Sequence, residues 1–471
     1  MIVILGILNY PQVWSPGVPQ KKFVSLAHDA FITAITGDLL DAGIFKSAAD
    51  WYLGFLESMI RDSWVDVFRP VLNNINLKTE TPSEEDIAVT FKALETIVSI
   101  LKEKNLALVD IVNALYKMGA LKETDGDQTH ATRLVFHAVG WITLLYSPDP
   151  NTKSVGLNIM SSDEAENHSK NIPSRRPGRP RSKIISKTRQ SIDLVDHPLP
   201  DLLKKFGRIM PEHDRPIFSG QITPLAPCYT RPDEWLEAPM LCFYTLHMVT
   251  SIKIEWVDCL CLHLDFDSQS KILRLFRFPS LCLVMCCNRQ QCCLSQLFSD
   301  AANRNGFNGP GQDDARDYFK EVLLSYRLIF GQDRSSWPYY KLLRPSLAAS
   351  VNETPDPLLD IVCGQSWESE DSRQIWNEIG AEDPADRYSL TEDFEFLSKR
   401  LMTLQRYVKG HNPSGFLSLW YDRRYPLQWW NLWVSAVMEF PRSSLKLSTG
   451  SAYYRQCSLV LCPPPSKSTL Y

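Results

Sequence analysis

Residues 253–282 constrain the fold of this 471-residue chain more than any other stretch. Apolar residues alternate with polar residues or cysteine over residues 260–266, and a period of two is typical of a strand with one buried face. Residues 254–257 also favour a strand, and a turn-forming sequence at 267–270 leads into a second run that Pro279 ends. We predict a small antiparallel β ribbon that packs on helices or further strands, because an isolated ribbon is only marginally stable.

The same alternation places the side chains of the ribbon on two opposite faces. His263, Asp265 and Asp267 fall on one face, and Leu262 and Leu264 fall on the other. We expect the face with the histidine to be solvated or covered by a helix. This pattern favours an architectural role for the stretch over a catalytic one.

Residues 1–150 are predicted to form a helical domain. Apolar residues recur at steps of three and four through residues 23–147, which is the spacing of helices with one buried face. The best helix start is at residues 81–85, which supply a cap, a first-turn proline and acidic residues. Further helices are expected at residues 106–118 and 129–146.

The rest of the chain changes character several times. We predict a disordered acidic and basic linker at 151–198, followed at 199–250 by a proline-rich connector that contains one short helix. The ribbon and a cysteine-rich segment occupy 251–300, and a helical region follows at 301–412. Residues 413–471 are predicted to form an aromatic-basic stretch with a disordered or truncated tail. In the helical region, helices are expected at 313–330 and at 389–408, where Ser389 and Glu392 resemble a capping box. The predicted fold class is therefore mainly α with a small antiparallel β ribbon (α+β), with an N-terminal helical domain and a mixed C-terminal region.

A basic island interrupts a chain whose net charge is only -4. Residues 174–189 carry seven cationic side chains and no acidic one. Their centre resembles an AT-hook, whose extended Gly-Arg-Pro core lies in the narrow minor groove of A·T-rich DNA. Pro177 stands where that motif usually has arginine. The candidate nucleic-acid-binding residues are Arg175, Arg176, Gly178, Arg179, Pro180 and Arg181. A nuclear import signal and a plain solvated linker remain open as alternatives.

Twelve cysteines are present, and nine of them fall between Cys228 and Cys293. Uneven clustering in a long chain is typical of reduced intracellular thiols and not of a secreted disulfide framework. Cys259 and Cys261 with His263, or residues 282–292, offer sulfur and nitrogen ligands. Neither group has the paired two-residue spacing of a structural zinc site, so we predict buried thiols, no metal and no cofactor.

The Asp265-x-Asp267 pair is the strongest enzymatic candidate in the sequence. Two carboxylates on one strand face can hold a divalent cation in glycosyltransferases. This pair lies beside a predicted turn, where aspartate is common, and no nucleotide-binding βαβ pattern surrounds it. Phosphate-binding, zinc-protease, serine-hydrolase and kinase motifs are absent from the sequence.

The segment between Trp420 and Trp433 combines cations with aromatic residues, as do segments that approach a membrane interface. The apolar run that follows lasts about a dozen residues, short of the ~20 needed to span a bilayer. A helix docked on the protein itself or an interfacial contact explains the segment equally well.

Several stretches together resemble a family of uncharacterised fungal proteins. They are VFHAVGW at 135–141, IEWVD at 254–258, LCLHLDF at 260–266, LRLFRFPS at 273–280, LFSD at 297–300 and the segment from Trp420 to Trp433. The resemblance implies a transmembrane helix after the aromatic-basic segment. This chain turns polar after about Val434, so we expect its tail to be a truncated form of that end.

These observations predict a non-enzymatic intracellular interaction or scaffold protein, membrane-tethered in full-length relatives. Two alternatives stay open. One is a nuclear DNA-associated protein that uses Arg175–Arg181. The other is a divalent-ion-dependent transferase that uses Asp265 and Asp267.

Overall fold

The computed structural model describes residues 20–37, 43–76, 79–122, 128–149, 156–160, 184–211, 235–287, 292–304, 314–344, 355–364, 368–411 and 434. Residues Met1–Tyr421 belong to one compact unit, and Asp422–Tyr471 belong to a second. In the first unit, the buried apolar side chains form one continuous core that runs from the N-terminal helices to the last helix. The predicted helical domain and the mixed C-terminal region therefore share a core.

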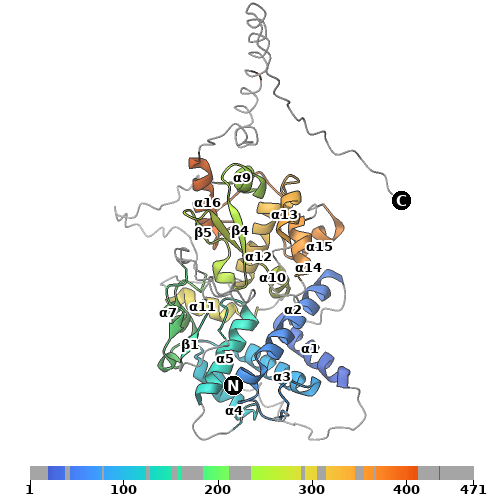
Figure 1. The fold of residues 1–471 in the computed structure, drawn as a ribbon, viewed down its shortest axis with the longest axis vertical. Helices are drawn as coiled ribbons and strands as arrows, with labels where there is room; N and C mark the ends of the chain where they lie inside the picture. Colours follow the sequence, from blue (N-terminus) through green and yellow to red (C-terminus); the bar gives the residue numbers. More distant parts are fainter. Residues whose placement is uncertain are drawn as a thin grey trace, which may run out of the picture. The chain divides into compact units, whose positions relative to one another are not determined.

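Helices build the N-terminal part of the first unit (Figure 1). They are α1 (Gln20–Thr36), α2 (Gly43–Asp62), the π-helix η2 (Trp64–Phe68), α3 (Glu84–Ile100), α4 (Leu108–Lys117) and α5 (Gln128–Thr143). Helix α1 packs along α3, and α5 contacts α2, α3 and α4. Every residue of α5 from Leu134 to Thr143 is buried, as expected for a helix that is apolar on all sides.

Helix α3 begins where the sequence predicts a helix start, with one adjustment. The cap is Ser83, whose hydroxyl accepts a hydrogen bond from the backbone N–H of Asp86, while the Asp86 side chain accepts one from the N–H of Ser83. The helix thus starts after the proline at position 82 and not at it.

Part of the predicted disordered linker is folded, so that prediction is wrong for residues 156–160 and 184–198. Strands β1 (Leu157–Asn158) and β2 (Arg189–Gln190) pair antiparallel, and η3 (Ile192–Leu194) leads to α7 (Leu199–Phe206). Leu157 and Ile184 are buried, so the segment contributes apolar surface that offsets its ordering entropy. A β-carbon on Gly207, which has a φ of 142°, would stand 2.1 Å from the carbonyl oxygen of Ile184.

The predicted ribbon is a three-stranded mixed sheet in the order β4-β6-β5. Strand β4 (Lys253–Val257) pairs parallel with β6 (Ile272–Phe276), and β5 (Phe266–Asp267) pairs antiparallel with β6. The predicted strand at 260–266 is wrong, because Leu260–Leu262 form the 3-10 helix η4 and Leu264 has a φ of 60°. The N–H groups of residues 260 and 261 bond to the carbonyls of Leu144 and Leu145 at the end of α5.

The remaining elements of the first unit belong to residues 236–410. They are β3 (Leu236–Glu237), α8 (Ala238–Leu241), α9 (Phe243–Met248), α10 (Pro279–Cys286), α11 (Ser295–Arg304), α12 (Asp314–Tyr326), the π-helix η5 (Arg327–Gly331), α13 (Trp337–Leu343), α14 (Pro357–Gly364), α15 (Glu370–Glu378), β7 (Arg387–Tyr388) and α16 (Ser398–Gly410). Helix α10 is buried along its whole length and packs against α1, α2, α12 and α14 (Figure 1). Strand β3 pairs antiparallel with β7.

Helix α16 begins nine residues after the predicted start at Ser389. The Ser389 N–H donates to the Asp393 carboxylate over 2.6 Å, which closes a turn there. The buried carboxylate of Glu321 on α12 instead accepts the N–H groups of Phe396 and Leu397. A distant carboxylate thus holds the two backbone N–H groups just before α16, and the N-cap residue Leu397 has no side-chain cap.

The structure confirms a mainly helical fold with small sheets of two or three strands. Among the described residues, no helix combines the length and the apolar character needed to cross a membrane.

Candidate functional site

A histidine and a serine meet beside strand β6. His263 follows η4 and Ser325 lies on α12, and both side chains are buried. The His263 Nε2 and the Ser325 Oγ are 2.7 Å apart. This pairing resembles the contact between a nucleophile and its base in hydrolases, so the direction of its hydrogen bonds decides its chemistry.

The hydrogen bonds run in the wrong direction for nucleophilic catalysis. The backbone N–H of Phe276 donates to the His263 Nδ1 over 3.2 Å. A neutral ring that accepts at Nδ1 carries its proton on Nε2, so His263 donates to Ser325. The Ser325 hydroxyl in turn donates to the carbonyl of Val322 over 2.6 Å. A general base would have to accept the serine proton, and here the ring donates instead.

The electrostatic environment keeps this histidine neutral. Burial lowers the pKa of His263 to about 3, and the nearby Arg400 charge acts in the same direction. Arg400, on α16, donates hydrogen bonds to the carbonyls of Cys261 and His263. Through these contacts His263 and Arg400 join the loop after η4 to β6, α12 and α16.

A buried arginine lies at the centre of the sheet. Arg274 on β6 is directly opposite Glu255 on β4, and its Nε is 3.3 Å from the Glu255 carboxylate. Its Nη1 is 2.9 Å from the Asp265 carboxylate. A buried charge needs such partners, because an unpaired guanidinium in the interior is very costly. The cluster thus joins β6 to β4 and to the residue that precedes β5.

The two aspartates of the predicted cation site have separate partners. Asp265 binds Arg274, as described above. The Asp267 carboxylate accepts hydrogen bonds from the N–H groups of Gln269 and Ser270 and from the Ser270 hydroxyl. Asp265 therefore neutralises a cation of the protein itself, while Asp267 shapes the turn.

Most thiols in the described ranges are buried, as the sequence predicts. All nine cysteines in the described ranges are free, and all except Cys287 are buried. Burial raises the pKa of the Cys282 and Cys286 thiols well above the ordinary value. Within the described part of the chain, no three His, Cys, Asp or Glu side chains are grouped so as to hold a metal ion.

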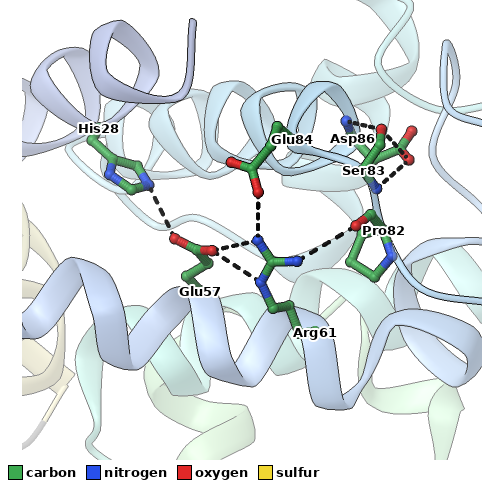
Figure 2. A network of polar contacts seen from close by, with 7 residues as sticks. All are labelled: His28, Glu57, Arg61, Pro82, Ser83, Glu84 and Asp86. Atoms are coloured by element: carbon green, nitrogen blue, oxygen red, sulfur yellow. Dashed lines mark hydrogen bonds and ion pairs between the residues drawn. The ribbon is translucent and has the colours of Figure 1, made fainter. Parts of the chain in front are cut away.

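A partly exposed polar network crosses three N-terminal helices (Figure 2). Arg61 on α2 donates to the Glu57 carboxylate at 2.6 and 2.9 Å and to the Glu84 carboxylate, at the start of α3, at 3.0 Å. The Nε2 of His28 on α1 is 4.0 Å from the other oxygen of Glu57. Burial lowers the pKa of His28, and the Glu57 charge opposes that effect. The network connects α1, α2 and α3 and presents charges of both signs to solvent.

Two predicted sites lie outside the described residues. These are the basic residues from Arg175 to Arg181 and the segment from Trp420 to Trp433. Comparison with protein-family models, curated proteins and solved structures gave no match for this chain.

Sequence reasoning identified His263 and Asp265 but missed Ser325, Arg274 and Arg400. One local signal was available. Arg274 alternates with leucine and phenylalanine in an apolar strand, and a cation in such a strand needs a buried anion. Ser325 and Arg400 have no comparable signal, because only the tertiary fold brings them to His263.

Proposed function

We propose that this protein is a non-enzymatic interaction or scaffold protein. The observation that carries the proposal is the proton arrangement at His263, where a buried ring donates to Ser325 and cannot activate it. Arg274 and Asp265 support the same conclusion, since each neutralises the other. The side chains with the most catalytic character thus serve to join elements of the fold.

The test measures two properties of the full chain, its association with partner proteins and its turnover of any substrate. A tagged wild-type chain and an Asp265→Asn variant are cross-linked in cells, and the proteins recovered at fixed stoichiometry are quantified. We expect the same partners from both, provided that circular dichroism shows the variant to be folded. Reproducible substrate turnover that is lost in a folded Asp265→Asn or Cys286→Ser variant would contradict the proposal and favour the divalent-ion-dependent transferase.

A second function, association with DNA, is favoured by the basic island. Seven cations without an acidic residue at 174–189 suit phosphate contacts, and the Gly178-Arg179-Pro180 core suits a narrow minor groove. The test is salt-dependent binding of the full chain to A·T-rich and G·C-rich duplexes. Arg179→Ala should abolish the preference for A·T-rich DNA. Lys187→Ala, which removes one charge outside the core, should weaken binding to both duplexes alike. Equal effects of the two substitutions would exclude groove recognition.

We also propose membrane association through the segment from Trp420 to Trp433, in keeping with the predicted relation to the fungal family. Cations followed by aromatic residues support it. The measurement is the localisation of the intact chain beside a chain that lacks residues 416–471. Membrane staining that persists in the shortened chain would exclude this segment as the anchor.

A further inference from the structure

Three sulfur atoms converge between helix α10 and the segment that precedes α11. The thioether sulfur of Met285 lies 3.9 Å from the Cys292 Sγ and 3.9 Å from the Cys293 Sγ. All three side chains are buried, so they face one another away from solvent.

The two sulfur–sulfur distances at Met285 match what a single metal ion requires. Metal–thiolate bonds are about 2.3 Å long, and three such bonds in a plane around one ion would separate the sulfurs by about 4 Å. Each thiol sulfur lies within hydrogen-bonding distance of the one thioether sulfur. An ion placed between the three sulfurs would replace the two thiol protons and make one bond to each sulfur.

We propose that Met285, Cys292 and Cys293 form a binding site for monovalent copper. Soft thiolate and thioether ligands favour Cu(I), whereas structural zinc sites are almost always four-coordinate and use cysteine, histidine or carboxylate ligands. Among the described residues no such set of three His, Cys, Asp or Glu side chains occurs. The thioether is therefore the ligand that makes this cluster selective. Binding would release the protons of the two thiols, and the ion and the two thiolates would together carry one negative charge.

The experiment loads the full chain anaerobically with Cu(I) and challenges it with a bathocuproine chelator. We expect one equivalent of copper to be retained and X-ray absorption to show three sulfur neighbours. Met285→Leu keeps the side-chain volume but should reduce the sulfur neighbours to two. It should weaken binding by about tenfold or more, since the loss of even an outer partner of a metal ligand costs that much.

Matched controls separate this site from the other cysteines. Met240→Leu and Cys363→Ser replace a buried methionine and a buried thiol elsewhere in the core, and both variants should keep the wild-type affinity. Cys293→Ser should lose the bound copper. The proposal is overturned if the wild-type chain releases its copper to the chelator as readily as Cys293→Ser does, or if Met285→Leu binds like Met240→Leu.

Discussion

His263 joins three parts of the fold through its ring and its backbone carbonyl. Its ring accepts from Phe276 on β6 and donates to Ser325 on α12, and its carbonyl accepts from Arg400 on α16. This arrangement requires a neutral ring, because a second ring proton would face the donating N–H of Phe276. Because the fold requires the neutral form of His263, protonation of this ring at low pH should lower the stability of the fold.

Acid should destabilise the protein through His263. The folded-state pKa is lowered to about 3, whereas an unfolded histidine titrates near ~6.5. The contribution of the neutral ring is fully present above the unfolded pKa and is lost as pH falls toward the folded pKa. Linkage predicts a loss of about 3 kcal/mol in the free energy of unfolding between pH 7 and pH 4. Denaturant titrations at the two pH values measure it.

The comparison with variants isolates this contribution from the carboxylates. Asp356 titrates in the same range, since burial raises its pKa to about 7 and opposes the hydrogen bonds from Ser280 and Leu358. Between the two pH values, the free energy of unfolding of His263→Gln should therefore fall by less than that of the wild-type chain. His197→Gln, at an exposed histidine, should behave like the wild type. Equal losses in all three proteins would refute the linkage.

At the scale of the elements, helix ends show what the sequence encodes locally and what it does not. The segment at 81–85 predicts the start of α3 because its capping hydrogen bonds lie within four residues. The segment at Ser389 has a similar pattern, but its N–H closes a turn with Asp393, and the N–H groups just before α16 bond to Glu321, which is distant in sequence. The alternation at 260–266 fails for the same reason, since its first N–H groups bond to residues after α5.

Helix α3 should lose stability when its cap is removed. Ser83→Ala leaves the N–H of Asp86 without its side-chain acceptor and should cost about 1 kcal/mol. Ser99→Ala is the matched control, because Ser99 is exposed on the same helix and its hydroxyl only bonds back to Glu95. The free energy of unfolding of each variant measures the effect. A cost at Ser99 as large as that at Ser83 would argue against the cap.

For the whole molecule, the sequence predicts the helical class but not the shared core. Apolar spacing identifies the buried face of each helix, yet it does not tell which helix that face meets. Phe278, just before α10, packs against Trp51 and Phe55 of α2 with ring centroids 5.2 and 4.9 Å apart. No local pattern connects residues more than two hundred positions apart, so two predicted regions prove to be one unit.

A substitution at this contact should weaken both regions together. Phe278→Ala removes a buried aromatic ring and should cost about 3–5 kcal/mol. Hydrogen exchange followed by mass spectrometry should show faster global exchange in peptides from α3 and in peptides from β6, because they share one core. Faster exchange confined to the peptides of β6 would mean that the two regions unfold independently.

The central claim, that the catalytic-looking side chains are structural, can be tested directly at Ser325. The folded full chain is treated with a fluorophosphonate, which labels serines that a neighbouring base activates, and its intact mass is measured beside that of a known serine hydrolase. We predict no adduct at Ser325, since its proton is donated to Val322 and the His263 ring donates to its oxygen. A stoichiometric adduct at Ser325 that disappears in a folded His263→Gln variant would contradict the claim.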